Sequence, residues 1–555
     1  MTVAKETQPV DFGERLARVR GQRAPSKDAD HERDTEQKAS AAKQAVDAVH
    51  MLNPELWHSG SDGYISLMVG GVPRTLAIRS SDFADLLGLI VYQTSDKPLA
   101  SDALRAAQNT LAAEARYAGP EYPVYSRIAH HAGDVWVDLG DQTGQAVQIT
   151  VNGWEVVEAS DVPIKFVRSR SALALPIPER SGSFTPLRTI FPQIDDEAET
   201  LVLGWLVGCF QPQGARAFCE LVGGQGSGKS TIARYLVSLV DPATVPARAL
   251  PRDEQALLIA TKYRAVLAFD NLSVISPEMS DAFCRISTGA GIGQRALFTN
   301  DEEVLLLAIL PLLWTCIEPQ AVRRPDLQDR TISISIGALD DSTLTEHEVD
   351  EAFQDVYPQL LGALYDAVSC ALRRRSFIRL DRLPRLADFA LWVEAAAPAL
   401  GWEDGRFIDV LEGSRTAANA LAVEANITAS AVVTFMKARM EWEGTAAELL
   451  VELRSAVDDE NRRARAFPRD ATRLSGQLKR LQRPLLAVGI GVGFHRTKAS
   501  RTIRLDRLER SPGEHQVKPS SMTETRSPAI PLGDDDSFWA ERNAIYGAAY
   551  RGEEI

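Results

Sequence analysis

The chain has 555 residues, of which 45% are hydrophobic and 25% are charged, and its formal net charge is −14. This length is too great for one hydrophobic core, so we expect three or four domains. The negative charge excludes a protein coated with nucleic-acid-binding surface, and any such site must be local. The five cysteines form no Cys-x-x-Cys pair, so the sequence predicts neither a zinc site nor a disulfide framework.

The beginning of the chain predicts no targeting or anchoring segment. It is charged and lacks an apolar signal region, and no apolar run is long enough to span a bilayer. We therefore expect a cytoplasmic protein without a membrane partner. Residues 1–53 are polar and poor in aromatic residues, which favours a flexible leader.

Residues 54–180 predict a β-rich α+β domain. Their alternating apolar pattern, broken by Gly-Asp, Gly-Gly and Asn-Gly turns, favours antiparallel strands, with one helix at 101–117. The predicted strands are 64–69, 75–79, 124–129, 135–139 and 146–151. Asp138 and Asp141 flank a turn and are either a metal pair or, as turn carboxylates usually are, solvated. We expect a recognition or docking role for this domain.

An apolar run at 217–222 leads into a glycine-rich loop that ends in Gly-Lys-Ser and opens a helical pattern. This is the G-x-x-x-x-G-K-[ST] phosphate-binding pattern in its strand–loop–helix context. Its backbone N–H groups and helix dipole suit the phosphates of ATP. Lys229 is predicted to reach the β and γ phosphates and Ser230 to bind Mg²⁺. The predicted nucleotide-binding residues are Gly223, Gly224, Gln225, Gly226, Ser227, Gly228, Lys229, Ser230 and Thr231.

A second strand of the same domain ends in an acidic residue. Five apolar residues at 265–269 precede Asp270, as in a buried parallel strand with an aspartate at its carboxyl end. Asp270 is therefore predicted to hold Mg²⁺ beside Ser230, and the alternative is a turn-forming role. The nucleotide domain, 186–343, also predicts helices at 195–210 and 272–286, a hairpin around 288–299, and strands at 307–316 and 331–336.

The order of these motifs resembles ATP-binding proteins of phages and mobile elements, whose core is similar to superfamily 3 and other AAA+ helicases. The resemblance rests on 223–231, Phe269–Asp270–Asn271–Leu272–Ser273, 280–285, 288–299 and the Arg-Pro-Asp-Leu-Gln-Asp-Arg run at 324–330. It implies an α/β P-loop NTPase core and an oligomeric ring, commonly a hexamer, with ATP between subunits. Arg330 would then be the arginine finger, with Arg324 as second candidate. Otherwise both arginines pair with Asp326 and Asp329 at the surface.

The resemblance also places Arg295 in a pore loop on single-stranded DNA, although the acidic residues at 301–303 make this a weak electrostatic site. Two departures concern hydrolysis. Asn271 stands where many relatives carry a glutamate that orients the attacking water, and an amide cannot accept the proton of that water. Thr315–Cys316 stands where relatives carry a sensor asparagine. The sequence therefore predicts nucleotide binding more strongly than turnover.

The C-terminal third predicts helices and a basic island. Residues 344–440 have helical periodicity and are expected to form a lid or connector. Residues 441–508 have a capping box at 445–448, a helix at about 470–483 and strands at 486–494 and 502–505, in winged helix-turn-helix order. The predicted DNA contacts there are Arg473, Gln477, Lys479, Arg480, Arg496, Lys498 and Arg501. The alternative is a solvated basic face, or an RNA or protein contact.

Residues 509–555 are expected to be a disordered tail. Their aromatic segment at 537–546 is a candidate partner-binding helix, and an idle tail is an equal alternative. The sequence as a whole favours an oligomeric ATP-dependent DNA motor, a helicase or replication initiator of a phage or mobile element. The rival interpretation is an ATP-gated DNA-binding regulatory or defence protein with little hydrolysis, and a small-molecule kinase is disfavoured by the basic island.

Overall fold

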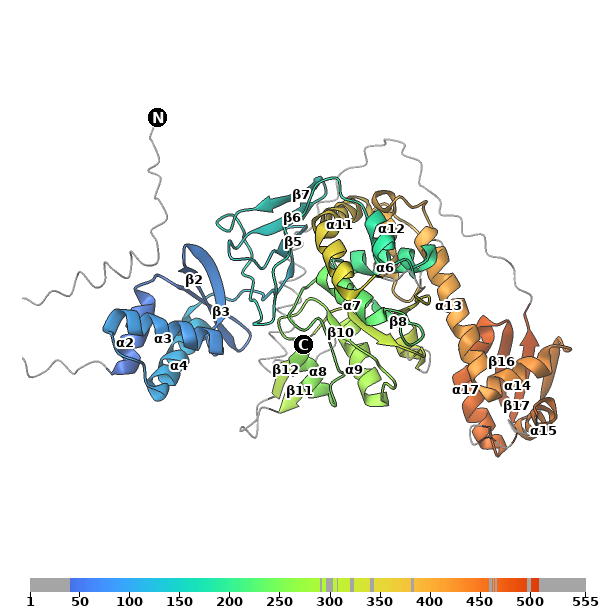
Figure 1. Cartoon of the computed structure of the whole chain (residues 1–555). Coiled ribbons are helices and arrows are strands. Elements are labelled where there is room, and N and C mark those ends of the chain that lie inside the picture. Colours follow the sequence, from blue (N-terminus) through green and yellow to red (C-terminus); the bar gives the residue numbers. More distant parts are fainter. Residues whose placement is uncertain are drawn as a thin grey trace, which may run out of the picture.

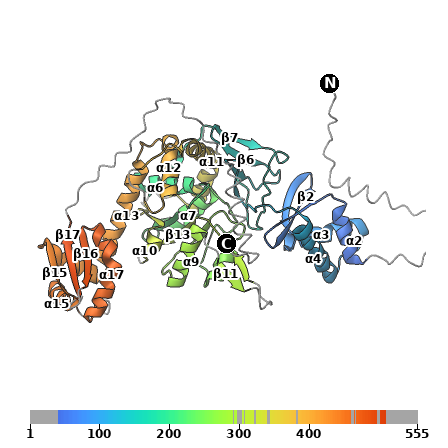
Figure 2. The same ribbon diagram turned by 180° about the vertical axis from the view of Figure 1, so that it is seen from behind.

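The computed structural model, shown in Figure 1, describes residues 40–289, 292–295, 303–306, 308–319, 324–339, 344–380, 384–458, 462, 464, 467–496 and 501–508. The predicted partner segment at 537–546 and the tail lie outside these residues. Figures 1 and 2, from opposite sides, show an N-terminal unit on one side of a central sheet and a C-terminal unit on the other. None of the described helices combines the length and hydropathy that a bilayer span requires.

The N-terminal unit is a three-stranded meander packed with three helices. Its elements are α2 (Ala41–His50), β1 (Glu55–Ser59), β2 (Asp62–Val69), β3 (Val72–Ala77), α3 (Ser81–Ser95) and α4 (Ser101–Ala118). The prediction of a flexible leader up to residue 53 is wrong for its last part, because α2 buries Val46 and Val49 in the same core as α3 and α4. Helix α3 was not predicted, since its apolar residues do not stand out from their surroundings.

A second antiparallel sheet has the order β4-β5-β6-β7. Its strands are β4 (Ile128–His131), β5 (Asp134–Asp138), β6 (Ala146–Thr150) and β7 (Gly153–Val157). The prediction of one domain over 54–180 is wrong, because this sheet buries Val137, Ile149 and Trp154 in the core of the nucleotide domain, whereas β1–β3 belong to a separate core.

The central sheet is parallel and has the order β14-β8-β13-β10-β9. Its strands are β8 (Phe218–Val222), β9 (Ala247–Arg248), β10 (Leu267–Phe269), β13 (Leu312–Cys316) and β14 (Thr331–Ser335). Helices α5 (Thr185–Ile190), α6 (Asp196–Gly208) and α7 (Lys229–Ser238) pack on one face, and α8 (Glu254–Thr261) and α9 (Pro277–Thr288) on the other. This arrangement is that of a P-loop core and confirms the predicted strands around 217–222, 265–269, 307–316 and 331–336.

Three helical elements extend the nucleotide core. They are α11 (Glu346–Arg374), α12 (Ala387–Ala396) and the 3₁₀ turn η2 (Ala397–Leu400). A capping box between Thr345 and Glu348 starts α11, which buries one face against α6 and the β4–β7 sheet. Helix α13 (Arg406–Ala425) then leads to the C-terminal unit (Figure 1).

The C-terminal unit has its own core. It contains α14 (Ile427–Met436), β15 (Glu441–Thr445), α15 (Ala446–Ala456), α17 (Ala471–Ala487), β16 (Ile490–Arg496) and β17 (Arg501–Arg507), with sheet order β15-β17-β16. The predicted capping box at Thr445 and Glu448 is confirmed. The predicted start at 441 cuts this core, because Val432 and Phe435 of α14 belong to it. Leu486 and Ala487 end a helix rather than begin a strand.

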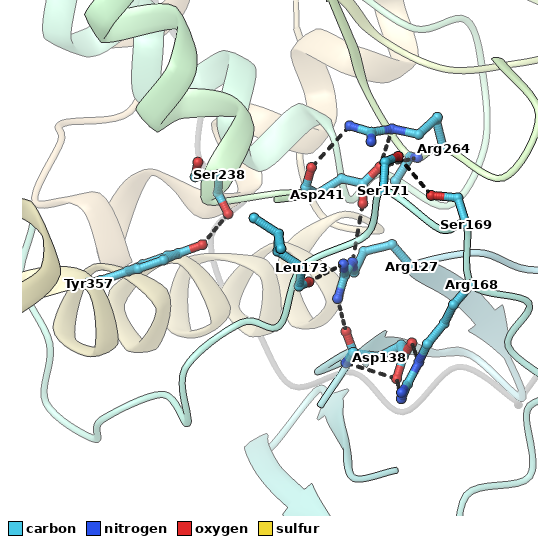
Figure 3. Close-up of polar contacts among 12 residues, drawn as sticks. Arg127, Asp138, Arg168, Ser169, Ser171, Leu173, Ser238, Asp241, Arg264 and Tyr357 are labelled. Atoms are coloured by element: carbon cyan, nitrogen blue, oxygen red, sulfur yellow. Dashed lines mark hydrogen bonds and ion pairs between the residues drawn. The ribbon is translucent and has the colours of Figure 1, made fainter. Parts of the chain in front are cut away.

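A buried carboxylate joins the β4–β7 sheet to the nucleotide core (Figure 3). Asp241, three residues after α7, lies 3.3 Å from Arg127 Nε and 3.0 Å from Arg264 Nε, and all three residues are less than 10% exposed. The guanidinium of Arg127 also donates to the backbone carbonyls of Asp138 and Leu173. Because Arg264 stands just before β10, this one carboxylate links the end of α7 and the start of β10 to the second sheet.

We expect Asp241→Ala to lower the free energy of unfolding of the nucleotide core by about 3–5 kcal/mol, because two buried guanidinium groups lose their carboxylate. Urea denaturation followed by tryptophan fluorescence measures the change. Asp82→Ala is the matched control, since Asp82 pairs with the exposed Arg170 and its loss is expected to change stability little. Equal effects of the two substitutions would contradict a central role for Asp241.

Candidate nucleotide-binding site and basic helix

The loop after β8 is built on glycine geometry. Gly226 and Gly228 have φ values of 79° and 76°, in the region that glycine adopts without strain. A Cβ atom on Gly223 would lie 2.8 Å from both the Ile336 carbonyl oxygen and the Ser227 hydroxyl. Gly228 is the N-cap of α7, so Lys229 and Ser230 begin the helix at its positive end. The sequence pattern at 223–231 thus has the loop shape that suits phosphate oxygens.

The ammonium group of Lys229 folds back over the loop. Its Nζ donates to the carbonyl oxygens of Gly223 at 2.9 Å and Gly224 at 2.6 Å, and to the hydroxyl of Ser227 at 3.1 Å. Partial burial lowers the pKa of this lysine from its ordinary value. An ammonium group that is held by neutral carbonyl oxygens gains when the charged oxygens of an anion enter the loop, because charged acceptors make stronger hydrogen bonds.

Ser230 and Asp270 meet, as the sequence predicts for a shared site. The Ser230 hydroxyl donates to Asp270 Oδ1 at 2.7 Å, and the Thr315 hydroxyl donates to the same oxygen at 2.6 Å. The Thr315 hydroxyl also accepts the backbone N–H of Asn271 at 2.8 Å. Thr315 is 1% exposed, so its hydroxyl is held in this arrangement by packing.

The strand order explains why Thr315 reaches Asp270. Strand β13 lies between β8 and β10, with Phe269 paired to Trp314 and Leu221 paired to Thr315. The end of β13 therefore stands between the glycine-rich loop and Asp270. Thr315 was singled out in the sequence as a departure from an asparagine sensor. In the fold it is the polar group at that position, linked to Asp270 by its hydroxyl.

Asn271 is exposed and has a φ of 56°, in the left-handed region that asparagine tolerates better than most residues. Its backbone is fixed by Thr315, and the next N–H, of Leu272, donates to the Thr315 carbonyl at 2.8 Å. The turn after β10 is thus tied to β13 twice. The Asn271 side chain is presented at the carboxyl edge of the sheet, beside Asp270.

The residues present fit a nucleotide with a divalent cation. A lysine and free helix N–H groups suit the phosphates, and a hydroxyl beside a carboxylate is the donor set that Mg²⁺ prefers. Ser230 and Asp270 would hold Mg²⁺, and Lys229 with the loop would hold the phosphates.

Neither Asp138 nor Asp141 belongs to this site. The guanidinium of Arg168 donates to both carboxylate oxygens of Asp138, at 2.6 and 2.7 Å, and the Asp141 carboxylate accepts the backbone N–H of Gly144 in the turn.

Arg330 lies at the opposite edge of the sheet from the loop. Its carbonyl oxygen accepts the backbone N–H of Phe218, the first residue of β8, whereas the loop follows the last residue of that strand. Five strand residues span roughly 16 Å, so the Arg330 side chain cannot reach the loop of its own chain. Arg324 is the N-cap of the short helix α10 (Pro325–Gln328).

A hairpin is present, but it lies later in the chain than the predicted 288–299. Thr288 ends α9, and β11 (Ile292–Arg295) pairs antiparallel with β12 (Glu303–Leu306), with Arg295 opposite Glu303. Residues 296–302, at its tip, lie outside the described residues.

Helix α17 carries the described part of the basic island. Thr472, Arg473, Gly476, Lys479 and Arg480 are exposed, whereas Leu474 and Leu478 are buried. Gln477, also a predicted DNA contact, is half-buried, and its Oε1 accepts the hydroxyl of buried Thr428 at 2.6 Å. Its contact with DNA stays a prediction. The side chains at 496–500 are not described, so the predicted contacts of Arg496 and Lys498 lie outside the described residues. Arg501 is exposed at the start of β17.

We expect Thr315→Val to leave ATP binding near the wild-type level and to lower hydrolysis about 10- to 100-fold, because Asp270 loses the hydroxyl that fixes it. Fluorescent-nucleotide binding and phosphate release measure the two effects. Thr315→Ser restores the hydroxyl and should recover most of the rate. Wild-type hydrolysis by the valine variant would contradict this role.

Comparison with known proteins gives a family. Residues 188–403 match the actinomycete integrative conjugative element replication protein, and residues 428–521 match the C-terminal domain of the same protein. No curated protein matches the chain. Among solved structures, the SCCmec type IV Cch active helicase aligns with 80% of this chain and 91% of its own at 12% identity and a TM-score of 0.42.

The apo NrS-1 C-terminal region aligns with 85% of this chain and all of its own at 10% identity and a TM-score of 0.37. The two family matches cover more than half of the chain, in the order of the replication protein itself. The chain therefore belongs to the replication protein family of actinomycete integrative conjugative elements.

Proposed function

We propose that this replication protein is an oligomeric ATP-dependent motor that acts on DNA, as a helicase or replication initiator of its mobile element. One observation carries the proposal. Lys229 and Arg330 stand at opposite edges of one sheet, so each chain holds both halves of a phosphoryl-transfer site that it cannot close by itself. A closed site then needs Arg330 from a neighbouring copy, and a ring, with a hexamer as the expected size, supplies one at every interface.

In this proposal each residue has a separate task. Lys229 and the loop N–H groups bind and orient the triphosphate, and Ser230 and Asp270 hold Mg²⁺, which neutralises charge on the phosphates when bound. Thr315 fixes Asp270. Arg330 of the neighbouring copy places a guanidinium fork on the oxygens where charge builds up, an interaction worth several orders of magnitude in rate. Arg324 is the second candidate for that role.

The C-terminal unit is proposed to bind duplex DNA as a winged helix. The order α14–β15–α15–α17–β16–β17 places α17 on the core with Arg473, Lys479 and Arg480 outward, and the β16–β17 hairpin follows it. In an acidic chain, a cluster of exposed cations on one helix supports phosphate contact and groove entry. The β11–β12 hairpin with Arg295 is proposed to meet single-stranded DNA inside the ring.

Asn271 supports a second candidate function, an ATP-gated DNA-binding protein with little hydrolysis. The residue beside Asp270 is an amide, which orients water without accepting its proton. Strand displacement on a forked duplex separates the two candidates. ATP-dependent displacement supports the motor, whereas nucleotide-dependent DNA binding without displacement supports the gated binder.

Subunit mixing tests the shared site. We expect Lys229→Ala and Arg330→Ala each to abolish hydrolysis alone, and the two together to recover part of it, because the loop of one variant meets the arginine of the other. Phosphate release with a DNA fork is the readout, and native mass measurement with and without ATP gives the ring size. The control is a mixture of Lys229→Ala with the double variant Lys229→Ala/Arg330→Ala. In this mixture no subunit has an intact loop, so no interface can be functional. Undiminished hydrolysis by Arg330→Ala would refute the shared site.

Salt titration tests the DNA contacts. We expect Arg473→Ala or Lys479→Ala to weaken duplex binding for all sequences alike and to reduce the slope of log affinity against log salt by about 1, as the loss of one phosphate contact does. Fluorescence anisotropy measures both. Arg105→Ala, which removes the same charge from the exposed surface of α4, should leave the slope unchanged. An equal effect of all three variants would argue against contact through α17.

A further inference from the structure

Two carboxylates stand just before Arg330 in the sequence, and both are paired with another arginine. Asp326 stands four residues before Arg330 and Asp329 stands directly before it. Arg385 Nη1 lies 3.2 Å from Asp326 Oδ1 and 2.8 Å from Asp329 Oδ2. Arg385 comes from a distant part of the chain, next to Leu386, the N-cap of α12, which is buried in the nucleotide core.

Arg330 itself is held only through a neutral group. Its Nη1 donates to the backbone carbonyl oxygen of Asp326 at 2.8 Å, and within the described residues it has no ion pair. The turn that presents it is anchored from α13, where Arg415 donates to the Asp329 carbonyl at 3.2 Å and Asn419 accepts from Gln328 at 2.7 Å. Among the described residues the guanidinium of Arg330 therefore has no carboxylate partner, although Asp326 and Asp329 stand just before it in the sequence.

This arrangement would not arise from the 324–330 segment alone. A carboxylate four residues before an arginine on a helical turn is at the spacing that favours an ion pair between them. An arginine that is already paired offers less to a phosphate, because its donors and its charge are partly used. Arg385 pairs with both carboxylates and so removes two competitors that are close to Arg330 in the sequence.

We propose that Arg385 is a positioning residue that occupies Asp326 and Asp329, so that the guanidinium of Arg330 stays free for the triphosphate bound to a neighbouring copy of the chain. The inference rests on the proposed function. It gives the helical region around α12 a role in the site, because the segment that carries Arg385 keeps the guanidinium of Arg330 free of carboxylates. Arg385 itself contacts neither nucleotide nor cation.

Arg385→Ala tests the proposal. We expect hydrolysis to fall by about tenfold or more and nucleotide binding to stay unchanged. The expected loss is smaller than the one that removal of an arginine finger causes. Arg379→Ala is the matched control, because exposed Arg379 in the preceding segment donates to the backbone carbonyls of Ser376 and Ile378 and pairs with no carboxylate in the described part of the chain. The variant Arg385→Ala with Asp326→Asn and Asp329→Asn should regain activity, because no carboxylate is left to capture Arg330. Loss that persists in this triple variant would overturn the proposal.

Subunit mixing separates a defect in the arginine from a defect in the loop. Arg385→Ala should recover activity with Lys229→Ala, which supplies an intact Arg330, and should not recover with Arg330→Ala. The reverse pattern, or activity of Arg385→Ala equal to that of Arg379→Ala, overturns the proposal. If Lys229→Ala and Arg330→Ala fail to complement each other, the shared site itself is refuted, and the role of Arg385 falls with it.

Discussion

One carboxylate oxygen, Oδ1 of Asp270, receives the hydroxyls of both Ser230 and Thr315, and the geometry of the candidate site depends on it. Ser230 comes from the helix after the loop and Thr315 from the end of β13, so this oxygen joins two elements of the sheet edge. The join is possible because β13 lies between β8 and β10. Had β10 been next to β8, Thr315 would not stand between Asp270 and the loop.

A second carboxylate organises the opposite end of the same elements. Asp241 follows α7, and its partner Arg264 precedes β10, so the helix that starts at the loop and the strand that ends at Asp270 are tied together at their far ends. Arg127 brings the β4–β7 sheet to the same point. A buried carboxylate between two buried guanidinium groups is costly to break, so this connection stabilises the packing of the helix against the strand.

The proposed motor divides its chemistry between the two edges of the sheet. The loop and Asp270 lie at the carboxyl ends of the strands, and Arg330 lies at their amino ends. Arg330 is therefore too far from the loop of its own chain to contact a phosphate bound there. Helix α13 leads to the C-terminal unit and also contacts the turn at 328–329 through Arg415 and Asn419.

The sequence by itself determined the local features, because these depend on residues that are close along the chain. Such short patterns predict the loop at 223–231, the capping box at Thr445, the P-loop strands and the acidic end of β10.

Features that depend on distant residues were decided by the tertiary structure alone. Helical spacing places Gln477 near Arg473 and Arg480, and the tertiary structure adds a hydrogen bond from the hydroxyl of Thr428 in α14 to its amide oxygen. Helix α2 packs in the N-terminal core, although the sequence around it is polar. The β4–β7 sheet packs in the nucleotide core and not with the strands that precede it in the sequence. The sequence marked Thr315 only as a departure from a sensor asparagine, and Arg385 belongs to no motif. Their contacts with Asp270 and with the two carboxylates before Arg330 arise because strand order and chain path bring these residues together.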